Sequence, residues 1–324
     1  MTKKLLVFGY FTFCLAAASC IPPIHPKPPD TRPLDSHHSN ALEVGGSLSY
    51  FIDYTDAMKR LGISDIMKDP GPYTFFIPNA NAFDVFLKKN KISALDELPD
   101  QELSQILLNH IIHGSYLVTQ ISTGYYPSLA FEETTHNPVD LYISTGALFE
   151  MNSQFCMGTP DIPADNGIIQ SITKVIDLPD VLDHLSYNPD FSVLYQVLSR
   201  TDLDRDYYTL LSSPGPLTFF APSDTAFSII LHDHPEWQTV DDIPAAILIT
   251  MLNYSIIPDE NILLKNIDND SLITSADGNE ISIKVLKNKR DEVTGYEAES
   301  ARILKSDIQA TNGVIQQIDR IIIP

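Results

Sequence analysis

The residues whose types and spacing could carry chemistry are few, and most of them are acidic. Residues Asp202–Asp206 alternate aspartate with other residues, like the start of a calcium-binding loop. Such a loop needs glycine at its sixth position and glutamate at its twelfth, where this chain has Tyr207 and Ser213. The triplet His232–His234 offers two imidazoles and a carboxylate, but the sequence indicates no further ligands for zinc. We therefore predict no metal site and no cofactor.

The sequence contains none of the common enzyme motifs. It has no Gly-x-Ser-x-Gly elbow, no His-Glu-x-x-His helix, no phosphate-binding Gly-Lys-Ser/Thr loop and no dinucleotide fingerprint. Acidic pairs such as Glu132–Glu133 are frequent in a chain with 42 aspartates and glutamates. A glycosidase would need two such carboxylates to converge in one cleft. We expect a protein without catalytic activity.

Composition and charge exclude further classes of protein. Hydrophobic residues make up 44% of the 324 residues and charged residues 19%, which is typical of a globular protein. The formal net charge of −21 repels phosphate backbones, so we expect no nucleic-acid partner. Only three cysteines are present, which excludes a disulfide scaffold and a four-cysteine zinc site. We expect Cys156 to be a small buried hydrophobe.

The N-terminal residues predict the cellular location of the protein. Two lysines precede an uncharged stretch from Leu5 to Ser19, which is typical of a secretory signal peptide over residues 1–19. The small residues directly before Cys20 resemble a bacterial lipobox, which implies cleavage before Cys20 and a diacylglycerol on its thiol. The alternative is an ordinary signal peptide in which Cys20 is incidental. Because Ile21 and not aspartate follows, the resemblance implies an outer-membrane lipoprotein of the cell envelope, facing either the periplasm or the cell surface.

A proline-rich tether is expected over residues 20–44. Six prolines fall between residues 21 and 33, and proline fixes φ and lacks a backbone donor, so a semi-rigid extended spacer is predicted. His25, His37 and His38 lie in this segment, as solvated linker side chains or as weak metal ligands.

The rest of the chain contains an internal sequence duplication. Three blocks recur in the same order at offsets of 144, 145 and 146 residues, which indicates a tandem domain duplication. We place the first domain at residues 45–182 and the second at 183–324. The matching blocks are Gly71–Phe83 with Gly215–Phe227, Asn109–His113 with Tyr254–Pro258, and Asn166–Gln170 with Asn312–Gln316.

Each copy places helices in its first half and strands in its second, which predicts the α+β class. Asn79 and Ser223 follow the short aromatic strands and are predicted helix N-caps. The pairs Asn166–Gly167 and Asn312–Gly313 stand between β-branched runs and predict hairpins. His110 ends an apolar helical stripe, so we expect a hydrogen-bonded core histidine.

These blocks resemble the fasciclin-type domain. The resemblance rests on Thr-Phe-Phe-x-Pro with Ala-Phe, on the Ile-Ile helix end, and on Asp-Ile followed by Asn-Gly and two apolar residues. It covers roughly residues 45–179 and 185–324. It implies two tandem domains, each a β-wedge of about seven strands with several helices. It also implies a non-catalytic adhesion or interaction module.

The family motifs are matched unevenly. Members often carry a Tyr-His pair at the helix end, of which copy one keeps His110 and copy two keeps Tyr254. The Pro-Asp-Ile motif of adhesive relatives corresponds to Asp161 with Ile162 and to Asp307 with Ile308. We carry over no integrin contact. Both aspartates are expected to accept local backbone hydrogen bonds, because a structural demand of the fold must be met in both copies.

Three functions agree with the sequence. The first is a lipid-anchored adhesion or interaction module that contacts a protein or a cell-surface partner. The second is a carbohydrate-binding accessory lipoprotein of a glycan-uptake system, and the third is a structural outer-membrane component. Trp237 and the pair Tyr125–Tyr126 either form an aromatic contact surface or pack in the core.

Overall fold

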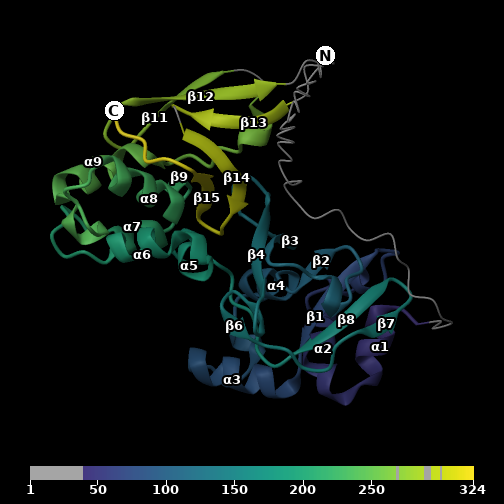
Figure 1. Ribbon diagram of the computed structural model, residues 1–324. Coiled ribbons are helices and arrows are strands. Elements are labelled where there is room, and N and C mark those ends of the chain that lie inside the picture. The colour runs from purple at the N-terminus through teal and green to yellow at the C-terminus, as the bar shows by residue number, and fades with distance from the viewer. Residues whose placement is uncertain (1–38, 268–269, 288–292, 300) are drawn as a thin grey trace, which may run out of the picture.

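The computed structural model describes residues 39–267, 270–287, 293–299 and 301–324, and it forms two lobes that each combine helices with a sheet (Figure 1). The expected signal peptide, Cys20 and the tether up to residue 38 lie outside this part of the chain. Within it, no helix is long and apolar enough to cross a membrane. The α+β class and the two tandem domains are confirmed.

The helices of domain 1 form because apolar residues recur at helical spacing and polar residues cap the ends. Asn40 caps the first helix, where its side chain accepts from the Glu43 N–H at 3.1 Å and Glu43 accepts from the Asn40 N–H in return. In the second helix, Tyr54 and Met58 are fully buried, as the periodicity predicts. The α-helices are α1 (Ala41–Ser47), α2 (Ile52–Arg60), α3 (Ala80–Asn90) and α4 (Asp100–Leu108).

One sheet of eight strands runs through the described part of domain 1. Its strands are β1 (Tyr73–Pro78), β2 (Ile111–His113), β3 (Gly124–Phe131), β4 (Pro138–Thr145), β5 (Phe149–Met151), β6 (Gln154–Phe155), β7 (Ile162–Ala164) and β8 (Gly167–Ile172). Their order is β6-β5-β4-β3-β2-β1-β8-β7, and β1 runs parallel to β8 while the other neighbours are antiparallel.

Domain 2 repeats this plan with its own helices and a seven-stranded sheet. The helices are α5 (Val181–Tyr187), α6 (Ser192–Leu198), α7 (Tyr207–Ser212), α8 (Asp224–Asp233) and α9 (Ala245–Ser255). The strands are β9 (Leu217–Pro222), β10 (Ile256–Pro258), β11 (Ser271–Thr274), β12 (Glu280–Lys287), β13 (Val293–Ala298), β14 (Ala301–Gln309) and β15 (Gly313–Ile318). Their order among the described residues is β10-β9-β15-β14-β13-β12-β11.

The parallel strand pair explains the glycine of each Asn-Gly motif. Gly167 faces Tyr73 where β8 begins beside β1, and a Cβ there would lie 2.0 Å from the Tyr73 carbonyl oxygen. Gly313 meets Leu217 in the same register, with a Cβ 2.2 Å from the carbonyl oxygen. Any other residue would push the two strands apart, so the glycines permit close pairing. Both motifs also lie at hairpins, as the sequence predicts.

The folded units begin earlier than the sequence suggests. The expected boundary between residues 44 and 45 falls inside α1, whose Ala41 is fully buried. The boundary between residues 182 and 183 falls inside α5, where Val181 is fully buried. Proline content does not mark these starts, because α5 begins two residues after Pro179 whereas α1 begins eight residues after Pro33.

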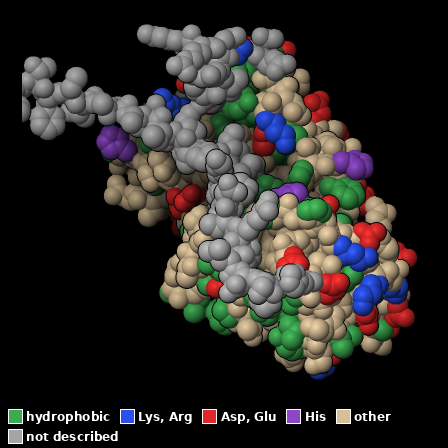
Figure 2. Space-filling view, turned by 90° about the vertical axis from the view of Figure 1, so that its right-hand side faces the viewer, with side chains coloured by type: hydrophobic (Ala, Val, Ile, Leu, Met, Phe, Trp, Pro, Cys, Tyr) green, Lys and Arg blue, Asp and Glu red, His purple; other side chains and the backbone are tan. Residues whose placement is uncertain are grey.

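Acidic side chains are spread over the surface of the molecule. On the face drawn in Figure 2, aspartates and glutamates lie scattered, and several stand beside lysines or arginines. Ion pairs of this kind join Lys59 to Asp56 at 3.1 Å and Lys68 to Asp65 at 2.7 Å. Such exposed pairs contribute little to stability, but they balance the local charge.

Candidate functional site

The aspartates of the Pro-Asp-Ile and Ser-Asp-Ile motifs tie a hairpin to a short helix in each domain. Asp161 has a left-handed backbone with a φ of 58°, and its Oδ1 accepts from the Val118 N–H at 2.8 Å. The Asp161 N–H donates to Gln170 Oε1 at 2.8 Å, and Gln170 Nε2 donates back to Asp161 Oδ1 at 2.7 Å. Asp307 and Gln316 repeat this exchange at 2.9 Å in both directions. These side chains join elements inside each domain.

The motif asparagines bind three backbone groups each. Asn166 Oδ1 accepts from the Ala41 N–H at 2.9 Å, and its Nδ2 donates to the Met67 and Asp69 carbonyls at 2.8 Å. Asn312 makes the same three bonds in domain 2, at 2.8–2.9 Å. Each asparagine therefore fixes the first helix of its domain to the segment that precedes the first strand.

The helix-end motif differs between the copies. His110 is fully buried, and its Nε2 accepts from the Ile176 N–H at 2.9 Å, so its proton is on Nδ1, which donates to the Ile106 carbonyl at 2.6 Å. Burial lowers the pKa of His110 to about 4, which keeps the ring neutral. Ser255, at the matching place, is fully buried, and its Oγ has no partner among the described residues. Tyr254 is buried and donates to a backbone carbonyl at 2.9 Å.

Four further motif positions lie within single domains. Asn79 caps α3 by accepting from the Ala82 N–H at 3.0 Å. Ser223 stands at the N-cap of α8, but its Oγ makes no capping bond and has no partner in the described part of the chain. Ile162 is half-buried in β7, and Ile308 is fully buried in β14.

The remaining candidates for chemistry have local structural partners. Asp202 pairs with Arg200 at 2.7 Å, and Asp206 caps α7. His234 stacks on Trp237 with ring centroids 4.2 Å apart. Within the ranges that the structure describes, no group of three or more histidine, cysteine or acidic residues is placed to hold a metal ion. Cys156 is fully buried.

Of the two alternatives for Tyr125, core packing is the one observed, and the cluster that holds it spans the domain interface. Tyr125 and Tyr142 are about 95% buried and pack in the same hydrophobic cluster as α5 of domain 2. The ring of Tyr125 lies 5.4 Å from that of His184, edge to face. Asp140, two residues before Tyr142 on β4, accepts from the Gln309 N–H of β14 at 2.8 Å. Figure 1 shows β4 and β14 meeting at this junction. Tyr126 is buried as well, within domain 1.

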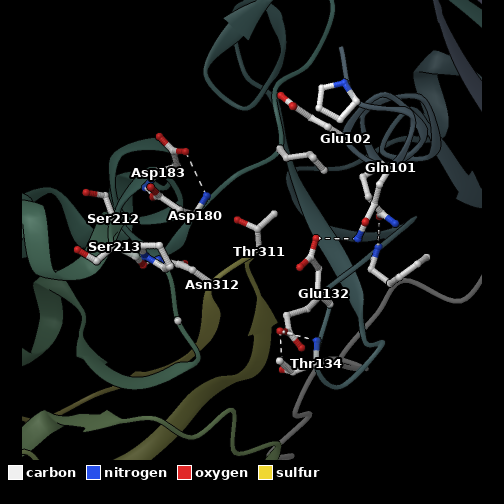
Figure 3. Close-up of a pocket in the computed structure, with 17 residues that line it drawn as sticks. Gln101, Glu102, Glu132, Thr134, Asp180, Asp183, Ser212, Ser213, Thr311 and Asn312 are labelled. Carbon is white, nitrogen blue, oxygen red and sulfur yellow. Dashed lines mark hydrogen bonds between the residues drawn. The ribbon is translucent and has the colours of Figure 1, made fainter.

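A cavity of about 690 Å³ opens beside this interface, and both domains line it. Domain 1 contributes the start of α4 and the turn between β3 and β4. Domain 2 contributes the start of α5, the end of α7 and the β14–β15 turn. Figure 3 shows Asp180 and Asp183 on one side and Gln101, Glu102 and Glu132 on the other. Five carboxylates line the cavity, and none of its lining residues is lysine, arginine or histidine: Glu102, Glu132, Glu133, Asp180 and Asp183.

Hydrogen bonds and burial set the charge of these carboxylates. Burial alone would raise the pKa of Glu132, but bonds from the hydroxyls and N–H groups of Thr134 and Thr135 outweigh it and lower the pKa. Burial and the charge of Asp183 raise the pKa of Asp180 to about 6, although a bond from the Asp183 N–H opposes the rise. The charge of Asp183 thus disfavours charge on Asp180, and both stand in a wall of five carboxylates without a basic side chain.

One neutral side chain completes the cavity wall. Gln105 is 8% exposed and lines the cavity. Its Oε1 accepts from the Phe131 N–H at 2.8 Å. Its Nε2 donor has no hydrogen-bond partner among the described residues, so it is available to a ligand.

Comparison with known proteins identifies the domains. The fasciclin domain family matches residues 49–179 and again residues 189–324. This chain belongs to the fasciclin domain family. A solved structure of a FAS1 domain pair from the insect cell adhesion molecule fasciclin I has the same fold, with a TM-score of 0.52 and 18% identity. It covers 85% of this chain, and the alignment spans 97% of that structure.

Two relatives place the fasciclin domains in different protein contexts. Human periostin is 25% identical over 276 residues, which cover 84% of this chain but only 30% of periostin. The uncharacterized protein sll1735 of Synechocystis is 30% identical over 146 residues, which cover 45% of this chain and 98% of that protein. The fasciclin pair described here thus spans under a third of the length of periostin.

Few features of the sequence predict the cavity between the fasciclin domains. The sequence shows Glu132–Glu133 as an acidic pair. Whether this pair lines a cavity depends on its position relative to Asp180 and Asp183, which come from the other domain. A proline followed by an aspartate and a second aspartate three residues later signals the capped start of α5. That signal locates a helix and does not reveal which surface it faces.

Proposed function

We propose that this protein is a non-catalytic interaction module of the cell envelope, anchored by a lipid on Cys20, whose two fasciclin domains contact a protein at the cell surface. The match of the fasciclin family to both halves carries this proposal. The likeness to a domain pair from a cell adhesion molecule supports it. The small residues before Cys20 and the following prolines support the anchor.

The geometry of the cavity favours binding over catalysis. Asp180 and Asp183 bond to each other's backbone N–H groups at the start of α5, at 2.8 and 3.1 Å. Glu132 is occupied by the two threonines of its turn. These carboxylates are held by their own chain, and catalysis would instead need an acid and a base directed at one substrate atom. The burial of Tyr125 and Tyr126 removes these two residues as a glycan-binding surface, and Trp237, which is half-buried, stacks on His234.

The anchor and the adhesion are tested together in cells. Wild type, Cys20→Ala and the control Cys14→Ala are compared by membrane fractionation, fatty-acid labelling and cell aggregation. We expect Cys20→Ala to lose the label and aggregation. Cys14→Ala should keep both, because cleavage removes Cys14.

Each half of the proposal can fail separately. A Cys20→Ala protein that still labels and stays in the membrane contradicts the lipid anchor. Aggregation that does not change when the protein is deleted contradicts the adhesive role.

A further inference from the structure

We propose that the interdomain cavity binds a positively charged segment of the protein partner, with lysine or arginine side chains inserted between the two fasciclin domains. This inference rests on the proposed function, because it names the chemistry of the partner that the two domains contact. The evidence is the charge of the cavity, the repulsion among its carboxylates and an unused donor in its wall.

The cavity brings together acidic side chains from both domains. Some exposed acids elsewhere have a basic neighbour, as Asp56 has Lys59 and Asp202 has Arg200, whereas others, such as Asp53 and Asp84, are in no ion pair among the described residues. The lining of the cavity has five carboxylates and no basic side chain. Opposite charges attract more strongly in a partly enclosed site than in open water, so a ligand cation gains more here than at the exposed acids. A neutral glycan would gain nothing from the net charge.

The repulsion between carboxylates strengthens the argument. Asp180 and Asp183 stand at the first turn of α5, partly buried and close to each other. Burial first, and then the charge of Asp183 on Asp180 and of Asp177 on Asp183, raises both pKa values, although the backbone hydrogen bonds between the two residues and the charge of Lys89 near Asp183 oppose the rise. A bound cation would offset this repulsion. We therefore expect cation binding to weaken at pH 5, where Asp180 is largely protonated, relative to pH 7.5.

The rest of the wall fits a peptide. The free Nε2 donor of Gln105 can bond a backbone carbonyl, which a peptide carries beside each basic side chain. Phe131, Leu178 and two prolines line the same cavity. They offer apolar surface to the methylene stems of lysine and arginine. The volume of about 690 Å³ holds a few side chains and excludes a folded domain.

The test measures binding of one defined peptide to matched variants of the full-length protein in non-ionic detergent. The probe is acetyl-triarginine-amide, titrated by calorimetry at pH 7.5. The cavity variant is Glu102→Gln with Glu133→Gln. The control is Asp53→Asn with Asp84→Asn, two exposed acids of α2 and α3 that do not line the cavity and have no hydrogen bond among the described residues. Both double variants change the net charge equally.

We expect the cavity variant to lose roughly tenfold in affinity, which corresponds to about 1.4 kcal/mol, and the control to lose less than twofold. Circular dichroism and thermal melting confirm that both variants fold. Equal losses in the two variants would mean that the peptide follows the overall charge of the protein, and would overturn the inference. Binding of maltotriose that needs Glu102 and Glu133, without binding of triarginine, would overturn it in favour of a glycan.

The outcomes also separate this inference from the proposed function. Aggregation that survives Glu102→Gln with Glu133→Gln overturns the inference and leaves the adhesive role intact. If triarginine binds at the cavity but deletion of the protein leaves aggregation unchanged, the adhesive role is overturned and the inference about the cavity stands.

Discussion

Asn166 in domain 1 and Asn312 in domain 2 make the same three backbone bonds, whereas the residues that join the two domains have no such counterparts. His184 of α5 stands where α1 has Val44. Asp140 is the buried third residue of β4, and the third residue of β12 is the exposed Ser282. The comparison separates two kinds of polar residue. Those that recur serve each fasciclin fold, whereas a residue that occurs once can join the two domains, as His184 and Asp140 do, or serve one domain alone, as His110 does.

We expect the largest effect on stability from replacing the asparagines that recur in both domains. Asn166→Ala and Asn312→Ala each lose three hydrogen bonds to buried or half-buried backbone groups. We expect each change to lower the free energy of unfolding of its own domain by about 3–4 kcal/mol. Urea titration followed by circular dichroism reports both domains, and fluorescence of Trp237, the single tryptophan, reports domain 2. Effects that differ by more than about 2 kcal/mol would contradict an equivalent role.

Asp140 represents the residues that join the two domains, and its contribution to stability should depend on pH. It is 2% exposed, its Oδ1 has no partner in the described chain, and burial raises its pKa to about 7. Lys305 and Lys265 oppose this rise, and Asp307 adds to it. Because the folded pKa lies above the unfolded value of about 3.9, the stability that Asp140 contributes is full below pH 4. It is lost as the pH rises through 7.

The variant Asp140→Asn stays neutral and isolates this effect. We expect it to exceed wild type in unfolding free energy by on the order of 3 kcal/mol at pH 8 and to lose that advantage at pH 4. His110 and His184 titrate in both proteins, so their contributions cancel in the difference. A constant difference between Asp140→Asn and wild type from pH 4 to pH 8 would refute the assignment.

The motif aspartates should behave as a matched pair of moderate size. Asp161→Ala and Asp307→Ala lose bonds to backbone N–H groups and place alanine at φ values of 58° and 59°. We expect each to cost about 2–3 kcal/mol. Asparagine tolerates the left-handed backbone and keeps an acceptor, so the Asn variants should cost less than about 1 kcal/mol. Affinity for triarginine should not change, and a large loss of affinity without loss of stability would make these aspartates contact residues.

The smallest test uses two caps at matching positions that the structure distinguishes. Asn79 bonds the Ala82 N–H, so Asn79→Ala should destabilise domain 1 by about 1 kcal/mol. Ser223 makes no capping bond, so Ser223→Ala should change the stability of domain 2 by less than about 0.5 kcal/mol. Denaturant midpoints measured on both variants decide the matter, and equal costs would show that Ser223 caps α8 in solution.

The sequence predicts each domain well because the signals for it are local. Helical spacing locates Tyr54 and Met58 in the core, and the Asn-Gly pairs locate hairpins, since neighbouring residues determine both features. The duplication confirms them by repetition. The interface is different, because Asp140 meets Gln309 across 169 residues of sequence and no periodic pattern records that contact. The cavity follows from the interface and could not be predicted before it.

The bond between Asn166 and Ala41 has a mechanical consequence. The chain enters domain 1 at Ser39, whose carbonyl accepts from the Asp165 N–H at 3.0 Å, two residues before the bond that Asn166 makes. Tension applied at residue 39 is thereby delivered to the turn between the edge strand β7 and its inner neighbour β8. Because β8 lies alongside β1 over six paired positions, a pull from that side also loads this parallel strand pair.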